Sequence, residues 1–204
     1  MAPKYRLSYF PVKALGEPIR LLLTYGKIDF EDNRVTSEDW PKLKPSTPMG
    51  QMPLLEIDGK VFHQSIPLCR YLAKLVGLAG SNDLENLEID IVVEILQDFR
   101  SKLAAVYYDS DEELKEKKFV TLKEEVIPFF LKKLEEIIAE NNGYLAIGKL
   151  TWADLWFAGA ADYINRIARQ DIIADSPGLK ALLTKVLALP QIKAWYETAP
   201  ATEF

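Results

Sequence analysis

The chain has 204 residues, of which 49% are hydrophobic, and its 25 Lys and Arg are outnumbered by 30 Asp and Glu, for a formal net charge of -5. This composition is typical of a globular protein and excludes a disordered or fibrous one. The acidic balance and the lack of a Lys- or Arg-rich stripe argue against a nucleic-acid partner.

Residue counts and patterning exclude further classes of protein. No run of about 18 apolar residues is present to span a bilayer. The residues after Met1 lead into a strand-like pattern rather than a signal peptide, so we expect a cytoplasmic protein. Cys69 and His63 are the single Cys and the single His, which excludes an internal disulfide, a structural zinc site and a Cys–His protease.

The first third of the chain alternates strand-like and helix-like patterns. Strands are predicted over residues 5–10 and 30–35. A helix is predicted between them, from about Gly16 to Gly26, because Pro18 suits a first helical turn and apolar residues recur on one face. A strand–helix–strand unit this short favours a parallel pair of strands with a right-handed crossover.

A hairpin and a second helix complete this region. The strand-like residues 54–57 and 60–62 flank Asp58 and Gly59, a pair that tolerates the positive φ of a type I′ turn. Ser65 is predicted to cap the helix that follows. The apolar face of this helix carries Leu68, Leu72, Leu75 and Val76.

From Leu84 onward only helical periodicity remains. Apolar residues recur at helical spacing over residues 87–103 and 119–134, and Pro128 is expected to kink the second of these helices. A third helix is predicted to begin at Thr151. Shorter helices follow near Leu179 and Gln191.

The segment 78–83 has the small and polar composition of a linker. The sequence therefore predicts two domains, an α/β domain over residues 1–77 and an all-α domain over residues 84–204. No internal repeat is present.

Tyr9 ends the first predicted strand, at the edge where open α/β sheets bind ligands. A phenol at this edge can donate a hydrogen bond to a thiolate. Lowering a thiol pKa from about 8.5 to about 6.5 takes about 2.7 kcal/mol of preferential stabilisation of the anion, which one or two donors in a dry site can supply. The alternative is that Tyr9 is a strand aromatic that only packs.

Residues around the hairpin can form a site next to Tyr9. A cis peptide bond before Pro53 would leave backbone groups free to pair with a ligand's peptide backbone. The first turn of the helix at Ser65 would stabilise a docked carboxylate, and Lys44 could hold a second one. Each residue also has a purely structural alternative: an edge-strand proline, a helix cap, a solvated cation and, for Trp40, a core aromatic.

Together these residues resemble the cytosolic glutathione transferases, and specifically the sigma class, which also contains the glutathione-dependent prostaglandin D synthases and the S-crystallins. The resemblance covers essentially the whole chain. Its carriers are Tyr5-Arg6-Leu7-Ser8-Tyr9-Phe10, Gly16-Glu17-Pro18-Ile19-Arg20, Asp39-Trp40-Pro41, Gly50-Gln51-Met52-Pro53-Leu54-Leu55-Glu56, His63-Gln64-Ser65, Arg70-Tyr71-Leu72 and Gly148-Lys149-Leu150-Thr151-Trp152-Ala153-Asp154.

The resemblance implies that residues 1–77 form a thioredoxin-like domain that binds glutathione as co-substrate. It also implies that residues 84–204 form a helical domain that carries most of the electrophile site, and that two copies of the chain form a homodimer. Tyr9 would be the catalytic hydroxyl that activates the sulfur. The implied glutathione contacts are Tyr9, Trp40, Lys44, Gln51, Met52, Pro53, Gln64, Ser65 and, contributed by the partner subunit, Asp98.

The implied electrophile pocket is apolar and aromatic, which suggests lipid-derived substrates, either unsaturated aldehydes or hydroperoxides, and a role in detoxification. Its lining is Phe10, Leu15, Tyr107, Tyr108, Trp156 and Phe204. No metal is expected, because the acids associated with a metal in the vertebrate prostaglandin D synthases are incomplete here, where Glu94 and Gln97 accompany Asp98.

Three other functions are weighed against this one. The resemblance to the vertebrate prostaglandin D synthases implies an Arg after the first strand and a Trp on the first long helix. This chain has Leu15 and Ala105 at the corresponding positions, which argues against a prostaglandin isomerase. A noncatalytic ligand-binding or structural protein would bind glutathione without turnover. A glutaredoxin-like redox role needs a Cys at the end of the first strand, where this chain has Tyr9-Phe10-Pro11.

Two features have structural explanations alone. Thr151 followed by Asp154 has the pattern of a capping box. Cys69 lies in the apolar helix after Ser65, and we expect it to be buried rather than catalytic.

Overall fold

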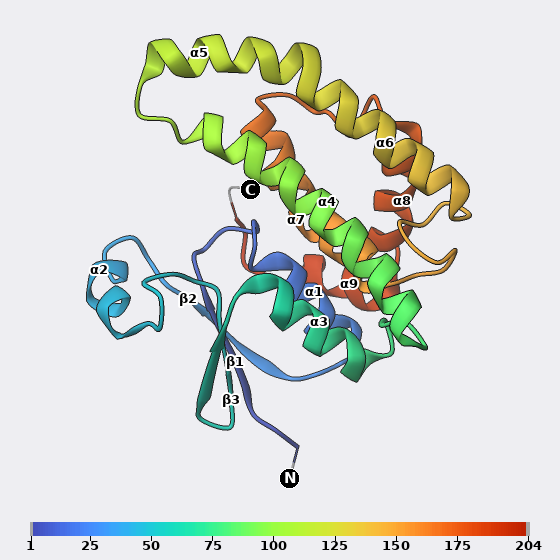
Figure 1. Cartoon of the computed structure of the whole chain (residues 1–204). Coiled ribbons are helices and arrows are strands. Elements are labelled where there is room, and N and C mark those ends of the chain that lie inside the picture. The colour runs from blue at the N-terminus through green and yellow to red at the C-terminus, as the bar shows by residue number, and fades with distance from the viewer. Residues whose placement is uncertain (1, 203–204) are drawn as a thin grey trace.

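The structure is a computed structural model, and it describes residues 2–202. Its N-terminal region contains a four-stranded sheet in the order β2-β1-β3-β4 (Figure 1). The strands are β1 (Tyr5–Tyr9), β2 (Phe30–Arg34), β3 (Leu54–Ile57) and β4 (Lys60–His63). Strands β1 and β2 are parallel, as the strand–helix–strand pattern predicts, whereas β3 is antiparallel to both β1 and β4.

The turn between β3 and β4 confirms the predicted hairpin. Asp58 and Gly59 have φ angles of 49° and 84°, as a type I′ turn requires. The Asp58 side chain also fixes the start of the sheet, because its Oδ1 accepts a hydrogen bond from the backbone N–H of Lys4 at 2.9 Å.

Helices α1 (Glu17–Tyr25) and α3 (Ser65–Val76) pack beside the sheet. The short helices α2 (Trp40–Leu43) and η1 (Lys44–Ser46) form a lobe at the left of Figure 1. Helix α1 is buried from Glu17 to Leu23 because it lies between α3 and the helical region. This central position lets α1 carry side chains that reach both regions.

The helical region is organised around α7 (Trp152–Ala168), of whose 17 residues 14 are buried because it contacts α1, α3, α4 and α8. A Cβ atom on Gly159 would lie 2.7 Å from the backbone nitrogen of Pro18, so this close approach of α7 to α1 requires glycine. The other helices are α4 (Asp83–Tyr107), α5 (Glu112–Thr121), α6 (Ile127–Glu140), α8 (Pro177–Leu187) and α9 (Pro190–Thr198).

The segment that connects the two regions is anchored rather than loose. Leu78 is buried, and its carbonyl accepts a hydrogen bond from the N–H of Trp152 at 3.1 Å. Helix α4 begins at Asp83, one residue before the expected start of the helical region. Within residues 2–202, no helix is both long enough and apolar enough to cross a membrane.

Two local predictions are corrected by the structure. The cap position of α3 is occupied by Gln64, which has a φ of 76°, and Ser65 is the first helical residue, with no side-chain cap hydrogen bond at this end. The distortion expected at Pro128 takes the form of a π-helical turn, η2 (Leu122–Val126), which ends two residues before it. Proline is then accommodated in the first turn of α6, where its missing N–H costs no hydrogen bond.

Candidate active site

Tyr9 lies at the carboxyl end of β1, with 7% of its surface exposed. Its hydroxyl oxygen accepts a hydrogen bond from the backbone N–H of Leu15 at 3.3 Å. Burial raises the pKa of Tyr9, while the Leu15 N–H and the positive charges of Arg20 and Arg100 oppose that rise. The phenol therefore stays protonated near neutral pH and can donate its proton in a hydrogen bond to an anion.

The loop between β1 and α1 is held in place by Arg20, which is completely buried. Its Nη1 donates to the carbonyl of Val12 at 2.9 Å, and its Nη2 donates to the carbonyl of Phe10 at 3.4 Å. The guanidinium carbon lies 6.0 Å from the centre of the Tyr9 ring. Arg20 thus fixes both the Tyr9 ring and the loop that supplies the Leu15 N–H.

Two carboxylates balance the buried charge of Arg20. Its Nε lies 2.9 Å from Asp32 Oδ1, and its Nη1 lies 3.0 Å from Glu17 Oε2. The other oxygen of Glu17 accepts a hydrogen bond from Trp195 Nε1 at 2.9 Å. Through Glu17, the cluster joins the loop beside Tyr9 to α9 in the helical region.

A small pocket next to this loop brings together residues from three separate segments. Leu15 of the predicted electrophile site lines it, together with all five predicted glutathione contacts that flank the hairpin: Gln51, Met52, Pro53, Gln64 and Ser65. The peptide bond between Met52 and Pro53 is cis, as expected. Met49 and His63 also line this pocket, and neither was predicted as a contact, although each lies within two residues of one that was.

The floor of the pocket is the amino end of α3. Gln64, just before this helix, has a φ of 76°, a backbone conformation that costs about 1–3 kcal/mol in a residue other than glycine and that occurs mainly at functional sites. The first N–H groups of α3 lack helical partners and carry partial positive charge. This end of the pocket can therefore bind a carboxylate.

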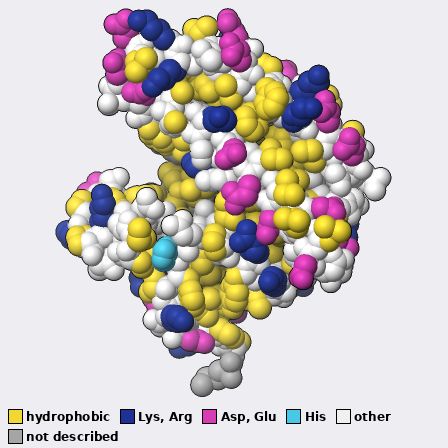
Figure 2. All heavy atoms as spheres, in the orientation of Figure 1, with side chains coloured by type: hydrophobic (Ala, Val, Ile, Leu, Met, Phe, Trp, Pro, Cys, Tyr) yellow, Lys and Arg dark blue, Asp and Glu magenta, His cyan; other side chains and the backbone are white. Residues whose placement is uncertain are grey.

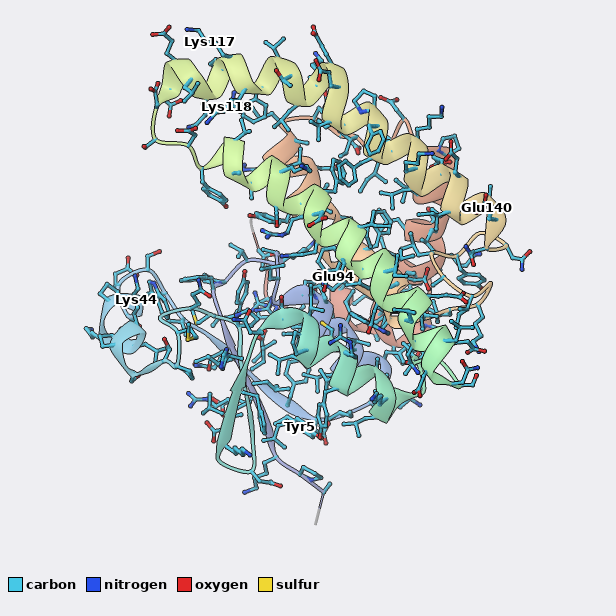
Figure 3. All side chains as sticks on the ribbon, viewed as in Figure 1. Tyr5, Lys44, Glu94, Lys117, Lys118 and Glu140 are labelled. Carbon is cyan, nitrogen blue, oxygen red and sulfur yellow. The ribbon has the colours of Figure 1, made fainter. Side chains whose placement is uncertain are left out.

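Trp40 and Lys44 lie on the lobe formed by α2 and η1, across from α3. The ring of Phe10 lies between those of Tyr9 and Trp40, with edge-to-face contacts whose centroid distances are 5.7 and 5.5 Å. Lys44 is exposed on the lobe (Figure 3), and no salt bridge with another described residue is formed by it. The lobe thus adds an aromatic edge and a free cation to the side of the site opposite Ser65.

The helical region contributes two adjacent tyrosines at the end of α4. Tyr107 accepts a hydrogen bond from Arg166 Nε at 3.2 Å, and the hydroxyl of Tyr108 lies 3.4 Å from that of Tyr163 on α7. Tyr108 is 62% exposed, whereas burial raises the pKa of Tyr163. These phenols place polar atoms at the carboxyl end of α4.

Comparison with known proteins identifies the family. The model described as glutathione S-transferase, N-terminal domain, matches residues 16–75, and the model described as glutathione S-transferase, C-terminal domain, matches residues 97–199. The chain belongs to the glutathione S-transferase family. Its fold is accordingly a thioredoxin-like domain followed by a helical domain, as the sequence predicts.

Individual relatives match along nearly the whole chain. Glutathione S-transferase S1 of Drosophila melanogaster is 55% identical over 199 residues, which are 98% of this chain and 80% of the relative. A glutathione S-transferase of Anopheles gambiae is 54% identical over 201 residues, 98% of this chain and 99% of the relative. The structure of prostaglandin synthase D of Nilaparvata lugens is 46% identical with a TM-score of 0.93, over 97% of this chain and 99% of that one.

Three further predicted site residues are Trp156, Phe204 and Asp98. Trp156 is 0% exposed within α7, so its indole belongs to the core. Phe204 lies outside the described residues. Asp98 is exposed on α4, one turn after Glu94, which is labelled in Figure 3, and among the described residues no ion pair involves it.

Proposed function

We propose that this chain is a sigma-class glutathione transferase in which the Tyr9 hydroxyl stabilises the thiolate of glutathione. The observation that carries the proposal is the position of Tyr9. Its hydroxyl is buried, remains protonated, and is held by the Leu15 N–H beside a pocket lined by Leu15, Gln51 and Met52. A donor fixed in this way costs no reorganisation when negative charge develops on the sulfur.

Glutathione is proposed to bind along this site in one direction. The γ-glutamyl end of glutathione binds at Gln64 and Ser65, where the amino end of α3 stabilises its carboxylate. The cysteinyl backbone pairs with Met52, and the glycyl carboxylate reaches Lys44 and Trp40 on the lobe. This orientation is supported by the two positive features at opposite ends of the site, the first turn of α3 and the exposed Lys44.

The chemistry needs only a thiolate held close to an electrophile. Glutathione loses its thiol proton to solvent, and the sulfur then bonds to an electrophilic carbon while a leaving group departs or a proton adds to the neighbouring carbon. With a hydroperoxide, the sulfur takes the terminal oxygen and the alcohol leaves. A second glutathione converts the resulting sulfenic acid to the disulfide and water. The rate gain comes from the lowered thiol pKa and from proximity.

The electrophile is proposed to bind between the two regions, against Phe10, Leu15, Tyr107 and Tyr108. This lining suits lipid-derived aldehydes and hydroperoxides, and hence a role in detoxification. We place the protein in the cytoplasm, where thiols are kept reduced, and a single buried Cys69 accords with that compartment.

We further propose that the active form is a homodimer. Hydrophobic side chains gather on the face formed by β4, α3 and the first half of α4 (Figure 2). Those at least 37% exposed on this face are Val61, Phe62, Tyr71, Leu75, Leu84, Leu87 and Ile91. A second copy would cover them, and it would bring Asp98 of the partner subunit toward the γ-glutamyl amine.

The test is the pKa of the glutathione thiol on the protein, measured by ultraviolet difference titration of thiolate absorbance. We expect about 6.5 in the parent and about 8.5 in Tyr9→Phe, since the donor is lost. Tyr5→Phe is the matched control, because Tyr5 is a second buried tyrosine of β1 at the opposite end of the strand (Figure 3). An undepressed pKa in the parent would favour a noncatalytic glutathione-binding protein.

A second candidate function is a glutathione-dependent prostaglandin isomerase. It is favoured by the 46% identity to prostaglandin synthase D of Nilaparvata lugens. Leu15 and Ala105 count against it, since neither offers a polar or stacking group for an endoperoxide. Direct turnover of the prostaglandin endoperoxide, compared with conjugation of a neutral aryl halide, separates the two functions.

A further inference from the structure

The loop between β1 and α1 contains a strained residue close to Tyr9. Ala14 is buried and has a φ of 36°. A positive φ is unfavourable for a residue that has a Cβ atom, and such a conformation persists only where the surrounding structure fixes it. Contacts on either side of Ala14 must therefore hold this part of the loop in place.

The conformation of Ala14 determines where the next backbone N–H points. The N–H of Leu15 donates to the Tyr9 hydroxyl oxygen at 3.3 Å. This bond makes the phenol a stronger donor, because hydrogen bonds in a chain polarise one another. If Ala14 relaxed to a negative φ, the N–H of Leu15 would turn away from Tyr9 and this reinforcement would be lost.

Lys13 directly precedes Ala14, and its side chain reaches two helices of the helical region. Its ammonium group forms an ion pair with Asp162 on α7 and lies 5.1 Å from the centre of the Tyr196 ring on α9. The Lys13 side chain is only 22% exposed, so solvent screens its charge less than that of a fully exposed lysine. The loop is thus fastened to the helical region one residue before the strained position.

The other anchors of the loop do not fix this position. Arg20 holds the carbonyls of Phe10 and Val12, so its hydrogen bonds end two residues before Ala14. The carbonyl of Lys13 accepts hydrogen bonds from the N–H groups of residues 16 and 17 at 3.1 and 2.9 Å. These bonds close the turn that contains Ala14, whereas the Lys13 side chain fixes where that turn lies relative to α7.

We propose that the ion pair between Lys13 and Asp162 positions the group that activates the sulfur. The pair holds Ala14 at its positive φ, and the Leu15 N–H therefore stays on the Tyr9 hydroxyl. Neither Lys13 nor Asp162 lines the pocket that contains Leu15 and Met52, so both act through the loop rather than on glutathione. This inference rests on the proposed transferase function and adds two positioning residues to it.

The first test is the thiol pKa of bound glutathione. In Lys13→Met and in Asp162→Asn it should rise about half as far as in Tyr9→Phe, with the dissociation constant of S-methylglutathione unchanged. The double variant should rise no further than either single one, because both substitutions break the same pair. Lys13→Arg should behave like the parent, since it keeps the pair. A thiol pKa that is unchanged in Lys13→Met would overturn the proposal.

Ala14→Gly tests whether the pair acts against strain. Glycine adopts a positive φ readily, so the loop should keep its conformation without the ion pair. In the Lys13→Met background, Ala14→Gly should restore most of the lowered thiol pKa, and alone it should leave the pKa unchanged. A failure to restore it would refute the role of Ala14.

Amide hydrogen exchange, followed by NMR in the free protein, tests the positioning without glutathione. In Lys13→Met the Leu15 amide should exchange about tenfold faster, while the Leu7 amide in the middle of β1 should keep its rate, because the opening is local. Arg6→Met is the matched control, since it breaks an exposed ion pair of the same strand and should change neither the exchange of Leu15 nor the thiol pKa.

The two measurements separate this proposal from the proposed function. An undepressed thiol pKa in the parent would refute the transferase function alone, and the exchange rate of Leu15 would still decide whether the ion pair holds the loop. Equal exchange rates in the parent and in Lys13→Met would refute that role. Faster exchange with an unchanged thiol pKa would show that the pair holds the loop without affecting sulfur activation, which also overturns the proposal.

Discussion

Arg20 in the N-terminal region and Asp154 in the helical region are both completely buried, and the two regions surround them differently. Arg20 lies between the carboxylates of Glu17 and Asp32. Asp154 meets no cation among the described residues. Its Oδ1 accepts the Leu145 N–H at 2.8 Å, and its Oδ2 accepts the N–H and the hydroxyl of Thr151 at 2.7 and 3.2 Å.

The two arrangements have different consequences. The pairs around Arg20 keep positive charge next to Tyr9 and hold the loop that shapes the site, so a change there should affect stability and catalysis together. The hydrogen bonds around Asp154 confirm the predicted capping box at the start of α7, and burial raises the pKa of this carboxyl to about 6. Changes there should affect stability and its pH dependence, and leave the site intact.

The largest effect is expected from Arg20→Met. It leaves Glu17 buried without its cation, while Asp32 keeps only its pair with Arg34. The free energy of unfolding should fall by about 3 kcal/mol. Urea denaturation measures the loss. Arg6→Met is the control, because the Arg6–Glu31 pair is exposed on both sides and should contribute less than about 1 kcal/mol. Equal losses in the two variants would mean that the Arg20 pairs are unimportant for stability.

Asp154→Asn should have a smaller effect and lower the free energy of unfolding by about 2 kcal/mol at neutral pH. The reason is that an amide nitrogen cannot accept hydrogen bonds from the Thr151 or Leu145 donors. The pKa of Asp154 is raised in the folded state, from 3.8 to about 6. The stability that comes from this raised pKa is therefore fully present below about pH 4 and is lost as the pH rises through about 6.

The pH dependence is checked by urea denaturation of both proteins between about pH 4 and 7. The stability advantage of the parent over Asp154→Asn should be largest at the acidic end and should shrink as the pH rises. An advantage that grows with pH would show that the hydrogen bonds to Asp154 outweigh its burial. Glutathione binding should be the same in both proteins at every pH.

Trp195→Phe should have the smallest effect and lower the free energy of unfolding by about 1 kcal/mol, because Glu17 loses one hydrogen bond and keeps its ion pair with Arg20. This change tests whether the Arg20 cluster connects the two regions. In the Arg20→Met background the same substitution should cost at least about 0.5 kcal/mol less, as measured by a double-mutant cycle. Additive costs would show that α9 and the cluster are independent.

The elements with strong local signals were predictable from the sequence. The Asp58-Gly59 turn, the Pro18 start of α1 and the Thr151–Asp154 cap each depend on a few adjacent residues, and the structure confirms all three. The predicted start of α3 was wrong by one residue, because Gln64 adopts a positive φ, which is unusual for glutamine and cannot be predicted from the residue type.

Residues whose roles depend on distant partners were less predictable. Trp156 is an aromatic residue of the kind that lines pockets, but the contacts of α7 with α1, α3, α4 and α8 bury its side chain. Arg20 appears in the sequence as part of a family motif, and its pairing with Asp32 across 12 positions follows only from the fold.

The missing side chain of Gly159 has a consequence for how this protein can adapt to new substrates. With α7 seated against the backbone of α1 at Pro18, and with Leu78 tied to Trp152, the two regions form one frame that resists hinge bending. The distance between Tyr9 and the wall of α4 is then set by this frame. New substrate preferences should arise by exchanging side chains on that wall, with the geometry of sulfur activation left unchanged.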